Sequence, residues 1–597
     1  MKRFRTYVKD IRWERIWLTI LLETQGQERF PEHFSAYLLN GKGVAETALQ
    51  VSENDGRSAA LVMNVSNSGV NRCIQNGTYT LLLLDEGTEQ FSEPEYDGDV
   101  ELLLNWGHVF HYDMTKGAYT IAFMLDEFAD FARFQLVFEN AYRRKMGNMI
   151  GRDDEQIQEY AYGEGDTEAD IVNTQIQNRK LPLWRRYLTK ARRRKYAKKL
   201  YETGRRLKRS GGRKCIVFFS QQDDDMTTNM KALYDRMIDR GLDREFDIIC
   251  SLRNSVAKVQ SPKGALKMVW DAAKADILIL DDHAPLFNYL VIDPQTVMIQ
   301  IWHAGAGFKG VGYSRWGHYG CPGPYSCHRQ YTYVLSPSAK ISSFFSEQFG
   351  VLDEQVIPTG MPRMDSFLNK ENHKKAAEKL YEMFPQIRGK RVILFAPTYR
   401  GRNRKDAHYP YEIVDFEGLY EFCLNKDAAV LFKMHPWVSD AVPLKKEWED
   451  RFFDLNTYPD INELFCVTDV LITDYSSSMF EYALLNKPML SFAYDKVQYS
   501  ATRGFHRSYD ENVPGKICTT FPELLKALQE EDYEYEKHES YMERHFDHTD
   551  DKNCDRVIDW LILGQMPEEY ASALEERKEQ IAQIRNMRFA QLIGITE

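Results

Sequence analysis

Residues 471–488 read LITDYSSSMFEYALLNKP, and this stretch decides the fold. The apolar run at 470–473 is typical of a buried strand, and Ser476 and Ser477 then stand where a helix would begin. A strand that runs through a short turn into a helix is the repeating unit of an α/β domain with a parallel sheet. The stretch therefore predicts an α/β fold with serines at the carboxyl end of a strand.

The same alternation of strand and helix continues on both sides of this stretch. A first series has apolar runs at 214–219, 246–250, 277–280 and 296–302, and helical stretches at 229–240, 265–273 and 336–349. A second series has apolar runs at 392–396, 429–434, 470–473 and 489–492, and helical stretches at 415–424, 461–466 and 477–485. Two such series predict two Rossmann-like domains that face a cleft, with ligands at the carboxyl ends of the strands.

Residues 1–138 have a pattern typical of β-structure. Short apolar runs recur at 16–22, 59–65, 79–84, 100–104, 119–125 and 134–138, separated by turn sequences such as Asn40-Gly41. This spacing predicts a β-sandwich-like domain. No group of catalytic residues stands out in it, so we expect an accessory or packing domain. Binding of a carbohydrate or a polymer is the alternative.

A strongly basic segment separates the β-rich part from the α/β part. Residues 179–214 hold 17 of the 77 basic residues and one of the 88 acidic residues, in a chain whose net charge is -11. Within this segment Trp184, Tyr187, Leu188 and Ala191 recur at helical spacing. A cationic helix with such a stripe is typical of binding to anionic lipid headgroups, so residues 181–209 predict contact with a membrane surface. A helix that packs on the protein, or one that binds nucleic acid, is the alternative; we expect no nucleic-acid partner.

Three further motifs follow apolar strands. Residues 299–310 read IQIWHAGAGFKG, residues 394–400 read LFAPTYR and residues 431–436 read LFKMHP. In the first motif, Ala304, Gly305 and Ala306 are small enough to expose backbone N–H groups to a phosphate or an acceptor oxygen. Because an ordinary histidine has a pKa near neutrality, His303 can act as a general base.

The other two motifs and the opening stretch offer groups that bind phosphate and sugar. Arg400, beside the hydroxyl of Thr398, can bind phosphate oxygens at two points. Lys433 and His435 alternate with apolar neighbours, so both point to one side of the strand end and can clamp a pyrophosphate. Ser476 and Ser477 begin a helix whose first N–H groups form an anion site, and Glu481 on that helix can accept ribose hydroxyls. Each motif alone is as well explained by a structural residue or a solvated loop.

Together and in this order, the motifs resemble the signature of the CDP-glycerol glycerophosphotransferase family of teichoic acid synthesis. The resemblance covers about residues 205–560 and includes TGMPRMD at 359–365 and the run from Tyr494 through 503–505 to 514–515. It implies a GT-B fold and a transferase that needs no metal or other cofactor. The implied reaction moves glycerol phosphate or ribitol phosphate from a CDP-alditol to a hydroxyl of a lipid-linked or polymeric acceptor, and CMP leaves.

The resemblance also implies a role for individual residues. His303 matches the catalytic base, and His435 matches the second essential histidine, at the donor phosphates. Donor-binding positions are matched by Arg363, Pro397, Thr398, Lys433, Met434, Ser476, Ser477 and Glu481; Trp302, Ala304, Gly305, Ala306 and Arg400 complete the candidate site. The family more often has Arg at 433 and Asp at 481, and it usually reads WHGTPLK where this chain reads WHAGAGFK.

Two other functions fit the motifs less fully. A GT-B glycosyltransferase that uses a nucleotide sugar could hold a metal at 223–225 or at 281–282, where aspartates follow apolar strands. A catalytically inactive scaffold could bind polymer and membrane. The spacing of Cys321, Cys327, His318 and His328 is too loose for a zinc site, so we expect no metal.

Length and composition are those of a multidomain protein. The 597 residues predict a β-rich accessory domain (1–138), a linker with basic helices (139–210), an acceptor domain (211–370), a CDP-donor domain (371–565) and a helical tail (566–597). The 9 cysteines are scattered through apolar runs, which indicates reduced thiols. No signal peptide and no run of about 18 apolar residues are found. We therefore expect a cytoplasmic protein, peripheral on the inner face of the cell membrane.

Overall fold

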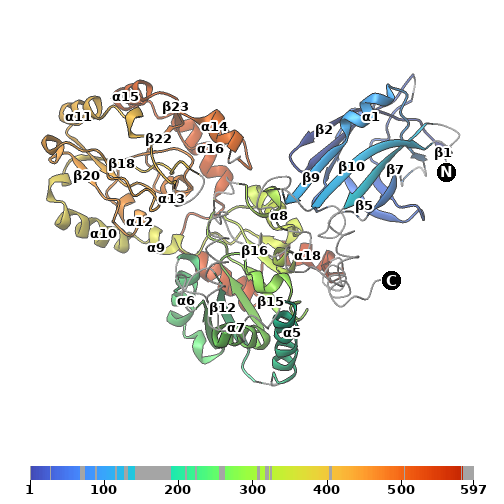
Figure 1. The fold of residues 1–597 in the computed structure, drawn as a ribbon, viewed down its shortest axis with the longest axis horizontal. Helices are drawn as coiled ribbons and strands as arrows, with labels where there is room; N and C mark the ends of the chain where they lie inside the picture. The colour runs from blue at the N-terminus through green and yellow to red at the C-terminus, as the bar shows by residue number, and fades with distance from the viewer. Residues whose placement is uncertain are drawn as a thin grey trace.

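The structure is a computed structural model, and three β-sheets account for most of its architecture (Figure 1). The structure describes residues 2–26, 28–67, 74, 76–85, 87, 90–113, 117–126, 132–140, 190–208, 212–221, 225–226, 228–253, 262–305, 310–315, 322, 326–401, 406–502, 505–579 and 581–582. None of the described helices is long and apolar enough to cross a membrane.

The N-terminal part forms one sheet of 11 strands. Its main path runs β2 (Tyr7–Glu14), β3 (Trp17–Glu23), β6 (Ser58–Asn64), β5 (Ala45–Asn54), β4 (Ser35–Leu39), β7 (Gly77–Asp85), β11 (Arg133–Asn140), β10 (Gly117–Asp126) and β9 (His108–Asp113). Neighbours on this path are antiparallel, whereas β1 (Lys2–Arg3) pairs in parallel with β8 (Gln90–Ser92), which joins β7. Hydrogen bonding is thus continuous, rather than divided between two separate sheets.

The two ends of this path meet because the sheet curls. Trp13 on β2 stacks on His108 at 5.1 Å and meets Phe110 edge-on at 5.7 Å, and both of these residues lie on β9. Alternate residues of β3, such as Leu18 and Ile20, point into the single core that results. The layers of a sandwich are therefore made by one curled sheet.

Residues 100–104, expected as a strand, form the helix α1 (Val100–Trp106) instead. The Asp99 carboxylate accepts a hydrogen bond from the Glu101 N–H at 2.9 Å, which caps the first turn. Only Leu103 of this helix is buried, while Leu104 is 78% exposed. The strand predicted here is therefore wrong, because Asp99 caps a helix at this point. Most side chains of this helix face outward.

The first parallel sheet has six strands in the order β13-β12-β14-β15-β16-β17. The strands are β12 (Cys215–Ser220), β13 (Asp247–Leu252), β14 (Ile277–Leu280), β15 (Val297–Gln300), β16 (Tyr333–Leu335) and β17 (Val356–Ile357). Crossover helices include α6 (Thr228–Asp239), α7 (Pro262–Lys274) and α8 (Ser342–Phe349). The predicted parallel sheet is confirmed; β16 and β17 are too short to have been recognised from the sequence.

The second parallel sheet also has six strands, in the order β20-β19-β18-β21-β22-β23. The strands are β18 (Arg391–Phe395), β19 (Ala428–Phe432), β20 (Phe452–Asp454), β21 (Val470–Thr473), β22 (Met489–Phe492) and β23 (Lys516–Cys518). Around it lie α9 (Met364–Leu368), α10 (Lys370–Met383), α11 (Phe416–Asn425), α12 (Ile461–Phe465), α13 (Ser478–Ala483), α14 (Lys496–Thr502), α15 (Phe521–Glu530) and α16 (Tyr535–His545). The order reverses between β18 and β21, which is where such sheets bind ligands.

The chain then returns to the first parallel sheet (Figure 1). The segment comprises α17 (Asn553–Arg556), η10 (Val557–Ile562) and α18 (Glu568–Glu576). Val557 and Ile558 are buried in the same core as the β12 residue Phe218. Arg236 of α6 and Arg240, directly after this helix, both pair with Asp555, at 2.7 and 3.0 Å. The C-terminal segment is thus an integral part of the first parallel domain.

The basic segment forms α5 (Lys190–Arg206), which packs on α7. Ala197 and Tyr201 are buried in this contact, and Gly204 approaches Ala273 and Trp270 so closely that a Cβ would lie 2.7 Å from the Ala273 side chain. Apolar residues of the C-terminal half of the basic segment therefore pack on the protein. Trp184, Tyr187, Leu188 and the side chain of Ala191 lie outside what the structure describes.

Glu347 of α8 joins all three folded parts. Its carboxylate accepts a hydrogen bond from Trp17 Nε1 at 3.1 Å and lies 3.7 Å from Arg15 of the N-terminal sheet domain. On its other side lies His506 Nε2, at 2.9 Å, from the second parallel domain. Burial alone raises the pKa of Glu347, but His506 and Arg15 together hold this pKa below its usual value. Figure 1 shows α8 between β9 of the N-terminal domain and α16.

Candidate functional site

The four sequence motifs lie at the carboxyl ends of four parallel strands. The WHAG motif follows β15, and the APTYR, KMHP and TDYSS motifs follow β18, β19 and β21. β18 pairs with both β19 and β21, so the APTYR, KMHP and TDYSS motifs lie at one edge of the second sheet. This edge contains the reversal of strand order, where the architecture leaves room for a ligand.

Trp302 and His303 form the turn after β15. Trp302 is buried and has a φ of 46°, a left-handed conformation that is uncommon for a bulky residue. The His303 ring lies tilted beside the Trp302 ring, with ring centres 4.1 Å apart. Its Nδ1 lies 3.4 Å from the carbonyl oxygen of Asp281 at the end of β14. Because a carbonyl oxygen can only accept a hydrogen bond, this contact assigns the proton to Nδ1 and leaves the Nε2 lone pair available.

The turn also contacts the second parallel domain. A Cβ on Gly305 would lie 2.5 Å from the Phe480 ring, so only glycine allows this approach to α13. One residue further along α13, Glu481 forms an ion pair with Arg363, which precedes α9. Burial lowers the pKa of Arg363 to about 10, so its guanidinium remains charged at neutral pH. The structure therefore brings the WHAG turn, Arg363 and Glu481 together.

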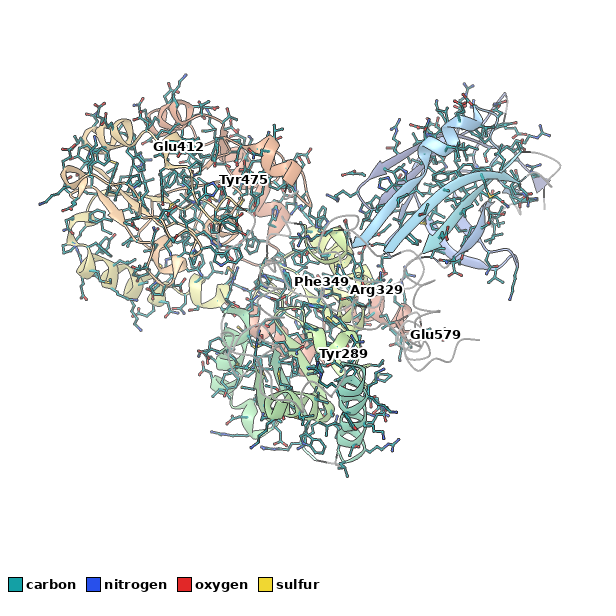
Figure 2. The ribbon with its side chains drawn as sticks, viewed as in Figure 1. Tyr289, Arg329, Phe349, Glu412, Tyr475 and Glu579 are labelled. Carbon is teal, nitrogen blue, oxygen red and sulfur yellow. The ribbon has the colours of Figure 1, made fainter. Side chains whose placement is uncertain are left out.

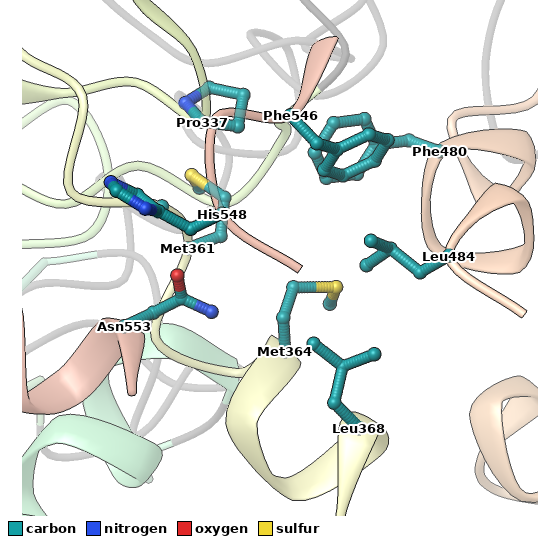
Figure 3. A pocket seen from close by; sticks show the side chains of 10 residues that line it. Pro337, Met361, Met364, Leu368, Phe480, Leu484, Phe546, His548 and Asn553 are labelled. Carbon is teal, nitrogen blue, oxygen red and sulfur yellow. The ribbon is translucent and has the colours of Figure 1, made fainter. Parts of the chain in front are cut away.

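A small apolar cavity lies beside this contact. Figure 3 shows the rings of Phe480 and Phe546, whose centres are 4.4 Å apart, above Met364 and Leu484. The cavity is lined from both parallel domains and by His548 of the returning segment. Its lining packs the two halves together and carries few polar groups, so it does not resemble a nucleotide site.

The Arg400 guanidinium is already bound by two carboxylates. It donates to Asp474 at 2.9 Å and to Asp495 at 2.6 and 2.8 Å, and it also bonds the carbonyl and hydroxyl oxygens of Thr398. Asp474 in turn accepts the Thr398 N–H at 2.8 Å. Tyr475, labelled in Figure 2, donates to Asp495 at 3.0 Å. Arg400 thus ties the APTYR loop to the TDYSS turn, while Thr398 and the neighbouring Pro397 are themselves buried.

Asn456 holds the KMHP loop. It accepts the Met434 N–H at 2.8 Å through its side chain, and its carbonyl accepts Lys433 Nζ at 2.8 Å. Burial lowers the pKa of Lys433. The Met434 side chain belongs to the hydrophobic core, so only its backbone can face a ligand.

His435 has the opposite arrangement to His303. Its Nδ1 accepts the backbone N–H of Trp437 at 3.1 Å, which assigns the proton to Nε2. The Tyr399 ring lies 4.6 Å from the imidazole, and the Trp437 ring lies 5.5 Å from it. His435 is half-buried.

The serines of the TDYSS turn are half-buried. Ser476 Oγ accepts from the N–H of Ser478 at 3.3 Å and bonds the Ser478 hydroxyl at 2.8 Å. Ser477 stands at the start of α13 but makes no capping bond through its side chain. Ser476 thus caps as expected, whereas the Ser477 hydroxyl takes no part in the cap.

Three residues near these motifs, two of them buried and Asn456 half-buried, were not recognised from the sequence. They are Asp474, which orders the APTYR loop, Asn456, which orders the KMHP loop, and Asn229, whose amide bonds the Trp302 carbonyl at 2.7 Å. Asp474 could have been found, because a buried acid directly after an apolar strand calls for a partner. Asn229 reads only as the start of a helix.

Other predicted residues lie elsewhere. Ala306, His318 and Cys321 are outside the described residues, as are two of the three aspartates at 223–225. Cys327 and His328 are buried, and His328 Nδ1 lies 2.9 Å from the Tyr331 hydroxyl. Within the part of the chain that the structure describes, no three His, Cys, Asp or Glu side chains are arranged to hold a metal ion.

Comparison with known proteins gives consistent matches. The chain is 39% identical to a teichoic acid poly(ribitol-phosphate) polymerase of Bacillus spizizenii over 354 residues, which are 59% of this chain and 57% of that protein. It is 36% identical to the ribitol-phosphate polymerase TarK of Staphylococcus aureus, over 58% of this chain and 67% of that protein. It is 27% identical to a teichoic acid glycerol-phosphate primase of Bacillus subtilis, over 51% of this chain and 77% of that protein.

A solved structure of the wall teichoic acid polymerase TagF aligns over 63% of this chain and 95% of that one, with 24% identity and a TM-score of 0.47. The chain thus spans little more than half the length of the Bacillus spizizenii polymerase. The sequence profile described as CDP-Glycerol:Poly(glycerophosphate) glycerophosphotransferase matches residues 203–563, which include both parallel sheets and all four motifs. The chain therefore belongs to the CDP-glycerol:poly(glycerophosphate) glycerophosphotransferase family.

Proposed function

We propose that this protein transfers ribitol phosphate or glycerol phosphate from a CDP-alditol to a hydroxyl of a lipid-linked or polymeric teichoic-acid-like acceptor, with release of CMP. The observation that carries the proposal is the meeting of Gly305 with Phe480. It places a histidine turn of one parallel domain against the helix that follows the TDYSS turn of the other. The names of the relatives support an alditol phosphate as the group transferred.

The donor is proposed to lie at the edge of the second sheet where its strand order reverses. Ser476, Ser477 and Lys433 line this edge and can donate hydrogen bonds to a pyrophosphate, whose charge Lys433 can partly neutralise. The Met434 N–H is already donated to Asn456. Glu481 is proposed to accept ribose hydroxyls and Arg363 to bind phosphate. Because these two side chains are paired with each other in the structure, donor binding would have to open or share their ion pair.

In the proposed mechanism His303 Nε2 takes the proton of the acceptor hydroxyl. The oxygen then attacks the phosphorus atom that carries the alditol, and the bond from this phosphorus to the CMP oxygen breaks. The His435 Nε2–H donates a hydrogen bond to the phosphate oxygens as negative charge moves onto CMP. The proton on His303 is lost to water after the product leaves. Positioning and charge neutralisation supply most of the catalysis in such transfers.

The finer architecture is part of the proposal. We infer a GT-B arrangement in which 211–370 holds the acceptor and 371–565 holds the donor. Two parallel sheets with their motif-bearing edges in contact through Gly305 support it, as does the return of the C-terminal segment to α6. No metal or other cofactor is assigned a role in it.

The test is CMP release measured with purified full-length protein, a lipid-linked acceptor, and CDP-ribitol or CDP-glycerol as donor. We expect turnover with CDP-ribitol to exceed that with CDP-glycerol, since the ribitol-phosphate relatives have the higher identities. We expect turnover to survive treatment with EDTA. CMP from neither donor, with UMP or UDP release from a nucleotide sugar instead, would overturn the proposal.

We further propose that α5 holds the protein at the inner face of an anionic membrane. Its exposed face carries Arg193, Lys195, Lys199, Arg205 and Arg206, and Tyr196 is 58% exposed among them. Since Ala197 and Tyr201 pack on α7, attraction would depend chiefly on charge and would weaken as salt screens it.

Vesicle sedimentation tests this contact. Reversal of Lys195 and Lys199 to Glu should release the protein from phosphatidylglycerol vesicles in low salt. Reversal of the exposed Lys374 and Lys375 of α10 is the matched control and should leave sedimentation unchanged. Equal binding by both double variants would refute the role of α5.

A further inference from the structure

Asn229 lies at the start of α6 and makes three hydrogen bonds to backbone groups. Its side chain is completely buried, at 0% exposure. Its Nδ2 donates to the carbonyl oxygens of Ile301 at 3.2 Å and of Trp302 at 2.7 Å. Its Oδ1 accepts the N–H of Arg363 at 3.0 Å. The hydrogen bonds of this amide therefore connect two segments whose nearest bonded residues, Trp302 and Arg363, are 61 residues apart in the chain.

The first segment carries His303. The carbonyls of Ile301 and Trp302 belong to the two peptide groups on either side of the Trp302 Cα, so one amide anchors both. Trp302 has the left-handed φ of 46° that turns the chain toward His303. Such a conformation persists only where the surroundings impose it, and Asn229 supplies two of the hydrogen bonds that do so.

The second segment carries Arg363. The N–H that Asn229 binds belongs to the residue whose guanidinium forms the ion pair with Glu481 on α13. The position of this N–H sets the point from which the Arg363 side chain reaches across to the donor side. Asn229 thus connects the acceptor-side histidine with the donor-side ion pair through two short links.

We infer that Asn229 is a positioning residue that fixes His303 relative to Arg363 for the transfer reaction. The inference rests on the proposed function for the reaction it names, but the link between the two segments is a property of the structure alone. Asn229 touches backbone groups and contributes no group to the chemistry itself.

The chain offers a closely matched control in Gln330. This buried amide donates to the carbonyls of Phe287 at 2.6 Å and Leu290 at 2.9 Å, and it accepts the N–H of Ile292 at 2.9 Å. It therefore makes the same pattern of bonds, two donated and one accepted, in the same domain. None of its partners adjoins a candidate site residue.

The experiment compares Asn229→Ala with Gln330→Ala in the full-length protein. Both should lower the melting temperature. Only Asn229→Ala should lower kcat by about 30-fold or more, with less than a threefold change in KM for the donor, because misorientation of a base acts on the chemical step. A loss of kcat that is equal in the two variants would show a general structural role and overturn the inference.

A double-mutant cycle with Arg363→Lys tests the link itself. If Asn229 acts partly through Arg363, its effect on kcat/KM should be clearly smaller in the Arg363→Lys background. The effect of Gln330→Ala should be the same in both backgrounds. If the effects of Asn229→Ala and Arg363→Lys on kcat/KM are strictly additive, the proposed link from Asn229 to Arg363 is overturned.

A readout independent of turnover is acylation of histidine by diethylpyrocarbonate, followed by mass spectrometry of the peptide that contains His303. We expect the acylation rate of His303 to change by about threefold or more in Asn229→Ala and not in Gln330→Ala. An unchanged rate would overturn the inference. If the wild-type protein releases no CMP, the proposed function fails, while this comparison still decides whether Asn229 positions His303.

Discussion

Each of the two candidate catalytic histidines lies three residues beyond the end of a parallel strand, but their hydrogen bonds are opposite. His303 follows β15 of the first parallel sheet, and its Nδ1 faces the Asp281 carbonyl, an acceptor. His435 follows β19 of the second parallel sheet, and its Nδ1 faces the Trp437 N–H, a donor. The first imidazole therefore presents a lone pair at Nε2, and the second presents a proton there.

This difference teaches that the backbone around a strand end can decide the role of an identical side chain. A free lone pair suits a base that removes a proton from an acceptor, whereas a fixed N–H suits a donor that stabilises phosphate charge. Four experiments can break or sharpen the comparison.

Replacement of His303 should have the largest effect. Both His303→Ala and His303→Gln should lower kcat by about 10³-fold, because neither side chain can accept a proton from the acceptor. Donor affinity, measured by calorimetry with a CDP-alditol, should stay within threefold of wild type. His33→Ala, at an exposed position of the N-terminal domain, is the control. Substantial turnover by His303→Gln would show that His303 is not the base.

Replacement of His435 should have a smaller effect that depends on the substitute. His435→Ala should lower kcat by about 10²-fold through loss of a hydrogen bond to developing charge. His435→Gln retains an N–H donor and should recover about tenfold of that loss. A Gln variant as inactive as the Ala variant would mean that His435 transfers a proton, so that the two histidines would not differ in kind.

Replacement of Arg400 should show whether this residue stabilises the fold or binds the phosphate of the proposed donor. Arg400→Met leaves the buried carboxylate of Asp474 and the half-buried carboxylate of Asp495 without their arginine partner, so we expect the free energy of unfolding to fall by about 3 kcal/mol. The measurement is urea denaturation, with KM for the donor determined on the protein that remains folded. A large rise in KM without a loss of stability would instead identify Arg400 as a phosphate ligand.

A third histidine provides the smallest expected effect and a reference for the other two. Burial, and next the charge of Arg507, lower the pKa of His545 to about 3. Below about pH 6.5 the unfolded chain binds a proton at this residue that the folded chain does not. The contribution of His545 to the free energy of unfolding should therefore be fully present above pH 6.5 and should be lost as the pH falls toward 3.

The measurement is the free energy of unfolding at pH 5 and pH 6. Wild type should lose about 1.4 kcal/mol more per pH unit than His545→Gln, which corresponds to one proton. The dependence of kcat on pH should be the same in both proteins. Equal slopes for unfolding would show that His545 takes up a proton in the folded state.

Much of the α/β region could be predicted because its signals are local. The apolar runs that became β14 and β21, for example, are bounded by polar turns, and their lengths match the strands observed. Residues at strand ends, such as His303 and His435, could be named because parallel strands place their carboxyl ends at one edge. The strand predicted at 100–104 is wrong because Asp99 caps a helix there, and a short apolar run does not by itself distinguish a strand from a helix.

What could not be predicted depends on contacts between distant segments. Arg400 reads as a phosphate ligand until Asp495, 95 residues away, is seen to bind it. The role of Asn229 is apparent only from its hydrogen bonds to Trp302 and Arg363. The curled sheet is a similar case, since its closure depends on Trp13 meeting β9 across 95 residues of chain. Such pairings involve loop closure over long distances, for which short sequence patterns carry no signal.

The junction at Glu347 has a consequence for how this protein can be rebuilt by recombination. Exchange of residues 1–138 for a domain without counterparts of Arg15 and Trp17 removes two partners of Glu347, which is 2% exposed and still faces His506. A buried carboxylate that loses its partners destabilises the protein by several kcal/mol, about 3–5 in typical cases. Hybrids should therefore survive only when the N-terminal domain and α8 come from the same parent.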